Sequence, residues 1–466
     1  MNKAWIPLAA LPLLACFLQA ASPVVSEIPL PEKIYPGLDS ILRSAVQQSP
    51  RMVSRALDME MADNDRITAR SNLLPTLNAG YSYNGSRDTY DYIYAPTSNG
   101  NPNPNSSITT KTSIKTPYWV TLSQPLFYWG ERRNNDKIGE IQQKIARGQY
   151  RQGYRLLAQE LRGGYLRLIV QKLALKRARF YQQYVNNMLK LQEERLLKKV
   201  ISEVDISVAR LNAEQGQLGL ERTELDYTNA KRSFARLAGL GTLEDEAIPD
   251  AVAETAYAAG PFDQLLAEFL AQKDPVSVEA FNLRQQIEIA NLNYANAKTR
   301  LRPKVNAVLG LSQDDQTNLL GAGSRYGLAS RYIGISVNWT LFDGLAAGAA
   351  ARNALMRRRG MENDYHQLTE QLAQDAQTAV RQLNFSARSM AIQDRLLVNN
   401  SGYLRTMKDD FRRGVKSESD VDQIQLNVYD SEVNASNARM DYLLKIGDFL
   451  GALNEDPIVA NLPFKS

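Results

Sequence analysis

Four short segments of the chain alternate apolar with polar residues, which is the period-two pattern of a β-strand with one apolar face. In the last segment, for example, Ile333, Ile335 and Val337 are separated by small or polar residues. Each segment has about ten residues, which is the length of a tilted strand that crosses a bilayer. The four predicted strands are residues 75–84, 116–126, 303–312 and 331–341.

Polar stretches separate the two strands of each pair. Residues 84–112 are rich in Asn, Pro, Ser, Thr and Gly, and they predict a solvated loop. Residues 312–330 predict a shorter loop of the same kind. Each pair of strands is therefore expected to form a β-hairpin.

Helical composition precedes the first strand, from Tyr35 to about Asn72, and follows each strand pair. Residues 128–197 contain no proline, and their leucines recur at the seven-residue spacing of a coiled-coil seam. Unbroken, such a helix is a rod of roughly 100 Å. After a short turn, a second helix returns antiparallel to the first. The predicted long helices fill residues 129–238 in the first half and residues 345–451 in the second.

The two halves of the chain repeat each other. The Leu-x-Pro motif at residues 73–75 recurs at residues 301–303, and Asp205 recurs as Asp420. An order that is kept over so many residues indicates an internal duplication, so both halves are expected to share one fold. The predicted parts are a signal peptide at 1–21, a first repeat at 35–247, a linker at 248–260, a second repeat at 261–453 and a tail at 454–466.

The N-terminal segment has the pattern of a secretory signal. Lys3 precedes an apolar run that ends in small residues near Ala21. Two interpretations of Cys16, the only cysteine, stay open. It is either removed with the signal or becomes the lipidated first residue of a lipoprotein. In both cases the mature chain has no disulfide bond.

Composition excludes several function classes. The net charge of +5 is small for 466 residues, and the basic residues are scattered, so we expect no nucleic-acid partner. His366 is the only histidine. The chain lacks a Gly-rich phosphate loop, a metal-ligand cluster and a nucleophile–base pair, so we expect no enzyme activity and no cofactor.

Aromatic residues gather at the ends of the predicted strands, where a membrane protein has its interfacial belt. A soluble β-sandwich with a buried face is the alternative for these strands. In a membrane, four strands cannot close a barrel, and three copies would give about twelve strands above a ring of helices. The candidate interface residues are Tyr118, Trp119, Phe127, Trp129, Tyr332, Trp339 and Phe342.

With these motifs in this order, the chain resembles a TolC-like outer membrane factor from about Tyr35 to Leu453. The resemblance rests on the duplicated order, on the segments QPLF at 124–127 and WTLFDG at 339–344, and on the Gly414 turn. It implies a mixed α+β membrane protein: a trimeric, 12-stranded β-barrel with four strands per chain in the outer membrane, continuing into a long α-helical coiled-coil tunnel in the periplasm. It also implies an export channel that works with a periplasmic adaptor and an inner-membrane pump or ABC transporter.

The resemblance further implies a gate at the periplasmic end of the tunnel. Asp420 matches the first acid of the family's acidic ring, with Asp422 beside the second position, and Lys416 and Asp205 match a latch pair. Gln423 takes the second ring position instead of an acid, and Phe411 replaces a latch tyrosine. An alternative for Asp205 and Asp420 is that they cap helix N-termini. The alternative function is a non-conducting periplasmic scaffold.

Overall fold

The computed structural model describes residues 28–92, 96, 98–99, 105, 107–257, 259–272, 277–318 and 325–461. The predicted signal peptide and Cys16 lie outside these ranges. The chain folds into two compact units. One comprises residues 1–59, 146–282 and 364–466 and is helical in its described part; the other comprises residues 60–145 and 283–363 and contains the sheet.

The elements follow the same order in both halves of the chain: short helices, strands, a helix of 67 residues and a returning helix. In the first half they are α2 (Pro31–Ile34), α3 (Pro36–Gln48), α4 (Pro50–Ser71), β1 (Thr76–Tyr81), β2 (Asn84–Tyr92), β3 (Ser107–Lys115), β4 (Tyr118–Phe127), α5 (Glu131–Leu197), α6 (Glu203–Ala238) and η1 (Asp245–Ala247). In the second half they are α7 (Gly260–Ala271), α8 (Val278–Lys298), β5 (Lys304–Asn318), β6 (Arg325–Asn338), α9 (Ala346–Arg412), α10 (Glu418–Ala452) and η2 (Pro457–Asn461). Among the described helices, none is long and apolar enough to span a membrane.

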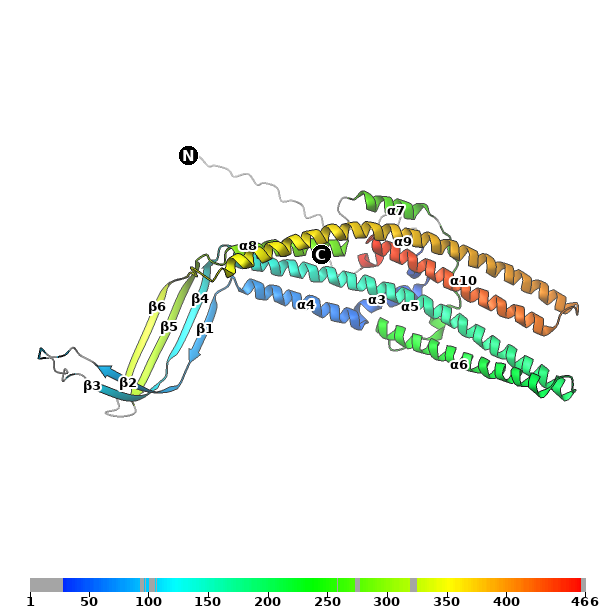
Figure 1. Cartoon of the computed structure of the whole chain (residues 1–466), viewed down its shortest axis with the longest axis horizontal. Helices are drawn as coiled ribbons and strands as arrows, with labels where there is room; N and C mark the ends of the chain where they lie inside the picture. Colours follow the sequence, from blue (N-terminus) through cyan, green and yellow to red (C-terminus); the bar gives the residue numbers. More distant parts are fainter. Residues whose placement is uncertain are drawn as a thin grey trace. The chain divides into compact units, whose positions relative to one another are not determined.

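The sheet is antiparallel throughout, and β1, β4, β5 and β6 lie side by side in that order (Figure 1). After breaks of two residues, β2 continues the path of β1, and β3 leads into β4. The hairpin of β2 and β3 joins the rest through β3, which pairs with the end of β5. The sheet therefore consists of four long strand paths, with β1 and β6 at its edges.

The prediction of loops at residues 84–112 and 312–330 is wrong, because much of each range forms strand. Their polar composition is typical of solvated loops, but Thr favours strands, and Thr and Ser hydroxyls that pair across the ladder stabilise them. Here Ser86 and Ser113 approach to 3.1 Å, and Thr89 and Thr110 to 3.3 Å. The strands β5 and β6 are accordingly longer than predicted, with 15 and 14 residues.

The core of the helical unit is formed by side chains of α3, α5, α6, α7, α9 and α10. The predicted leucine seam is buried at Leu161, Leu168 and Leu175, and becomes half-exposed at Leu189 and Leu196. Burial of this seam removes apolar surface from water, the main favourable term in folding. The long helices are thus held by packing along one side rather than around a globular centre.

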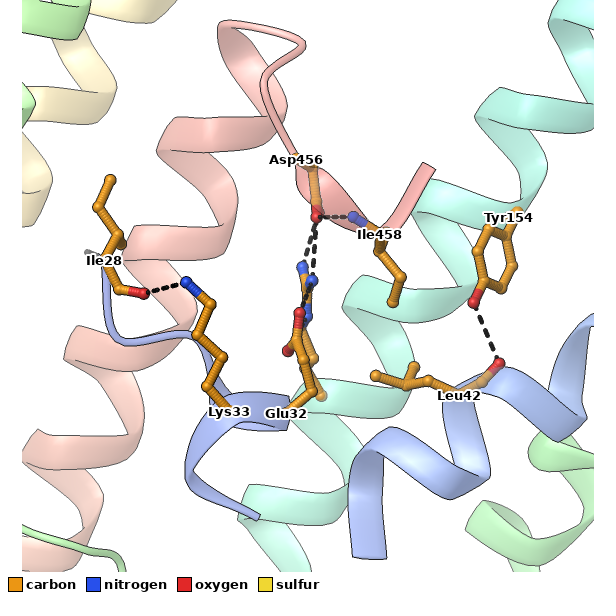
Figure 2. Close-up of polar contacts among 8 residues, drawn as sticks. Ile28, Glu32, Lys33, Leu42, Tyr154, Asp456 and Ile458 are labelled. Carbon is orange, nitrogen blue, oxygen red and sulfur yellow. Dashed lines mark hydrogen bonds and ion pairs between the residues drawn. The ribbon is translucent and has the colours of Figure 1, made fainter. Parts of the chain in front are cut away.

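A buried arginine joins the two ends of the described chain. The Arg162 guanidinium on α5 forms ion pairs with Glu32 at its Nη2 and with Asp456 at its Nη1, the latter at 2.6 Å. Figure 2 shows Glu32 and Asp456 converging on one point from two different segments. Burial alone would lower the pKa of Arg162, but Asp456 and Glu32 outweigh it and raise that pKa above its usual range. Arg162 therefore stays charged, and its two ion pairs fix both ends of the described chain to α5.

Candidate functional site

Both helical hairpins turn through the same backbone geometry. Lys199 and Gly414, which are equivalent in the two repeats, have φ angles of +55° and +74°. In each turn the next N–H closes the helix end: Val200 donates to the Arg195 carbonyl and Val415 to the Asp410 carbonyl, each at 2.9 Å. This is the left-handed C-terminal cap of a helix, which glycine adopts at the lowest cost.

The helix that follows each turn starts with a capping box. Ser202 and Asp205 bond reciprocally at the start of α6, as Ser417 and Asp420 do at the start of α10. Each serine N–H and hydroxyl donates to the aspartate Oδ2, at 3.0 and 2.8 Å in both boxes. The capping role of Asp205 and Asp420 is therefore confirmed.

These hydrogen bonds also set the charge of the two aspartates. The N–H and then the hydroxyl of Ser417 lower the pKa of Asp420, and Lys416 lowers it further by its charge. Ser202 lowers the pKa of Asp205 in the same way. Both carboxylates are exposed and stay ionised at pH 7.

The predicted latch pair is not formed within one copy of the chain. Among the described residues, no ion pair joins Lys416 to Asp205, and Lys416 instead lies close enough to Asp420 to affect its pKa. A second cation near this turn, Arg412, pairs with Asp409 of its own helix at 3.1 Å. A contact between Lys416 and Asp205 stays a prediction for an assembled form.

The second ring position makes a contact that the sequence did not predict. Gln423 accepts a hydrogen bond from the Tyr184 hydroxyl at 3.1 Å, which joins α10 to α5. Asp422 is half-buried, and burial followed by the nearby charge of Glu418 raises its pKa. The two acids at this tip of the helical hairpin therefore have pKa values shifted in opposite directions. Asp420 loses its charge at a lower pH than Asp422 does.

The register of the sheet separates two faces. Leu77, Leu122, Leu309 and Ile333 lie in one cross-strand row of the apolar face. Tyr118 lies on this apolar face, since it pairs with Tyr81 and Gln313. Side chains of the neighbouring positions point to the other face, which is mostly polar. Trp119 and Tyr332 lie on that polar face, so the seven predicted interface aromatics do not share one face.

Four of the predicted aromatics gather where the strands meet the long helices. The Trp129 and Trp339 indoles donate to the carbonyls of Pro303 and Leu301, at 2.8 and 2.9 Å. Phe127 packs edge-on against Trp129, with 4.7 Å between ring centroids. Phe342 is three-quarters exposed. Apolar rings with a polar handle are the residues that membrane interfaces favour.

The repeat is visible in these contacts as well. The Gln124 side chain donates to the Leu73 carbonyl at 3.0 Å, at the positions equivalent to Trp339 and Leu301.

Within the described ranges, no three His, Cys, Asp or Glu side chains are grouped closely enough to hold a metal ion. The site is thus built from helix turns and a two-faced sheet.

A family model described as "Outer membrane efflux protein" matches residues 41–240 and 282–445, one segment in each predicted repeat. The chain belongs to the outer membrane efflux protein family. The predicted resemblance is thereby confirmed. As a member of this transport family, the protein is an efflux channel of the outer membrane with a helical tunnel in the periplasm.

Solved channels share the fold of this efflux protein. The Campylobacter jejuni CmeC outer membrane channel is 14% identical and superposes with a TM-score of 0.68, over 90% of this chain and 86% of its own. The Vibrio cholerae outer membrane protein VceC is 15% identical, with a TM-score of 0.63 over 90% and 96%. The Neisseria gonorrhoeae MtrE channel, in its open state, is 16% identical, with a TM-score of 0.59 over 90% and 89%. A search of curated proteins finds no match.

Proposed function

We propose that three copies of this efflux channel protein assemble into one passive exit duct across the outer membrane and periplasm. A twelve-stranded barrel lies in the membrane, and the long helices form the tunnel below it. A periplasmic adaptor and an inner-membrane pump or ABC transporter open its tip. The duct serves a tripartite efflux pump or a type I secretion system.

The open edges of the sheet carry this proposal. Among the described strands, β1 and β6 each have a neighbour on one side only, while Ile333 and Ile335 of the apolar face are 85% and 70% exposed. An apolar face belongs in lipid, but in lipid an open edge leaves backbone groups without partners at a cost of several kcal/mol each. Pairing β6 of one copy with β1 of the next removes both edges, and three copies close a barrel of twelve strand paths.

The helices carry a second surface that calls for a partner. A row of apolar side chains follows one side of α6 at seven-residue spacing, and each is at least 60% exposed. They are Val204, Leu211, Leu218 and Leu225. We call this row the α6 stripe. On α9, Phe385 and Ile392 have the same spacing and are also more than half exposed. Such rows are typical of helices that pack against another helix, and a second copy offers one.

At the tip, Asp420 and Asp422 supply the acidic ring of the aperture. Three copies of Asp420 around a narrow pore concentrate negative potential and favour cations. In the assembled protein Lys416 pairs with Asp205 and holds the tip closed. Each exposed pair contributes only about 0–1 kcal/mol. Several together bias a two-state gate, for which a few kcal/mol is sufficient.

Single-channel recording in planar bilayers tests the duct and its ring together. Asp420→Asn is the informative variant, because the amide keeps an oxygen for the capping box and loses only the charge. We expect small, cation-favouring steps from the wild type and a lower cation preference in the variant. Ser417→Ala removes the hydroxyl of the same capping box and keeps the charge of Asp420, so it controls for any loosening of the cap.

Native mass spectrometry of the detergent-purified protein provides the second readout, with a trimer expected. Extraction without detergent, or the absence of conductance from a well-folded trimer, would favour the non-conducting scaffold. Equal effects of Asp420→Asn and Ser417→Ala on cation preference would show that Asp420 acts only as a cap.

A further inference from the structure

Two large aromatic side chains lie on the polar face of the sheet. Trp119 on β4 is paired with Gly80, and Tyr332 on β6 is paired with Gly310. The two residues are 44% and 48% exposed. Because the opposite face is apolar and suits lipid, the polar face is the inner wall of the proposed barrel. Trp119 and Tyr332 are therefore large aromatic residues on a face that otherwise carries mostly small polar residues.

Glycine makes room for both rings. A Cβ added to Gly80 would lie 2.6 to 2.7 Å from three atoms of the Trp119 indole. The near-equal distances place one face of the ring over the glycine. A Cβ on Gly310 would run into the Tyr332 ring in the same way. One face of each ring thus covers a neighbouring strand, and the other is open to the interior of the barrel.

The two rings lie near each other on this face. Their strands are separated only by β5, and the positions paired with them on β5, Ser312 and Gly310, are two residues apart. Sheet spacings place the two Cα atoms on the order of 12 Å from each other. Small residues occupy the space between, so a ligand of a few rings' width can contact both.

A carboxylate lies on the same face, one strand from Trp119 and further along the sheet from Tyr332. Asp314 points to the same face as Ser312, two positions further along β5, and is exposed. Among the described residues, no Lys or Arg forms an ion pair with it. A nearby cation of this face, Lys115, pairs with Asp88 at 2.9 Å. Open aromatic faces next to a free negative charge are the surroundings that bind organic cations.

We propose that Trp119, Tyr332 and Asp314 form a weak binding site for lipophilic organic cations on the inner wall of the barrel. The inference rests on the proposed function, since it needs the polar face to line a pore. Three copies of the chain would provide three such sites at one level of the barrel. Cargo of this class would pause there on its way out.

Block of potassium current by tetraphenylphosphonium tests the site. We expect Trp119→Leu to raise the half-blocking concentration by about threefold, the change that loss of an exposed cation–π contact produces. Asp314→Asn should raise it by about as much, because it removes an exposed charge that attracts the cation. Trp119→Phe keeps an aromatic face and should retain most of the block. Tyr118→Leu is the matched control, because Tyr118 is the chain neighbour of Trp119, is also 44% exposed and lies on the opposite face.

Equal block in the wild type, Trp119→Leu and Asp314→Asn would overturn the site, as would an equal loss of block in Tyr118→Leu. Calorimetric titration of the detergent-purified protein with the same cation, with empty micelles subtracted, does not depend on conductance. Binding that weakens in Trp119→Leu but not in Tyr118→Leu supports the site even if the protein fails to conduct. Conductance without any such difference retains the duct and rejects the site.

Discussion

At the residue scale, two buried arginines connect distant segments of the chain through ion pairs. Arg162 is 1% exposed, and it is acceptable in the core only because Glu32 and Asp456 surround it. Arg439 is 6% exposed and binds Asp394 and Glu254 at 2.9 and 2.8 Å. Each of these arginines ties segments that are far apart in the sequence, so the loss of one affects the packing of several elements.

Replacing Arg162 by methionine keeps the volume and leaves two acids buried without their cation. Removing one partner of a buried ion pair costs about 3–5 kcal/mol. We expect hydrogen exchange to accelerate by about a hundredfold or more in residues 28–34 and 453–458, which Glu32 and Asp456 tie to α5. Adding Glu32→Gln and Asp456→Asn to the variant should restore most of the protection. Unchanged exchange in the single variant would show that packing alone holds the chain ends.

The pKa values of the two tip aspartates should be shifted in opposite directions from the usual value of about 3.9. As the pH falls from 7, Asp422 is protonated first, because its folded pKa is raised, and Asp420 stays ionised below that value. The stability that the Asp420 cap contributes is therefore fully present above about pH 3.9, and is lost as the pH falls through its lowered pKa.

Cation preference of the channel, measured against pH, should accordingly fall in two steps. Asp422→Asn should remove the step at higher pH and leave the other. A single step that only Asp420→Asn abolishes would mean that Asp422 does not face the pore.

At the element scale, the sequence predicts helices and caps well and the polar strands poorly. The heptad leucines of α5 and the serine–aspartate spacing of both capping boxes are patterns of residues close in the sequence. They are therefore sufficient to predict these elements without knowledge of the tertiary structure. The strands β2 and β3 have no apolar face, and their polar residues look like loop until the cross-strand partners are known. The contact of Tyr184 with Gln423 depends on how α5 and α10 pack, which no local pattern contains.

The two helix turns can be compared by giving each turn the residue of the other. Lys199 and Gly414 share a left-handed conformation, which costs a residue with a Cβ about 1 kcal/mol. We expect Gly414→Lys to destabilise its turn by about that amount, and Lys199→Gly to stabilise its own turn slightly. Exchange of the Val200 and Val415 amide hydrogens, which close the two turns, measures both. Effects of the same sign in the two variants would contradict this account.

At the scale of the whole molecule, one copy leaves large apolar surfaces without partners. The apolar sheet face suits lipid, whereas the α6 stripe is part of the helical unit and suits another helix. A buried leucine contributes about 1.5–3 kcal/mol, so a row of four apolar residues is enough to influence assembly.

Charges in the middle of the α6 stripe should therefore disrupt assembly. We expect Leu211→Glu combined with Leu218→Glu to shift the protein from trimer to monomer in native mass spectrometry. Asn212→Glu combined with Gln217→Glu adds the same two charges at exposed positions beside the stripe and should leave the trimer intact. A stable trimer in the double variant would show that the stripe contacts something other than a second copy.

The duplicated tip has a consequence for symmetry. If three chains assemble, six turns with one backbone design surround the axis, since Lys199 and Gly414 match in conformation and the two capping boxes match in hydrogen bonds. The side chains do not match, because Ile201 takes the place of Lys416. A partner that recognises backbone and caps would encounter pseudo-sixfold symmetry, and a partner that recognises charge would encounter threefold symmetry. In such a trimer, the same end would match a ring of six subunits by its shape and a ring of three by its electrostatics.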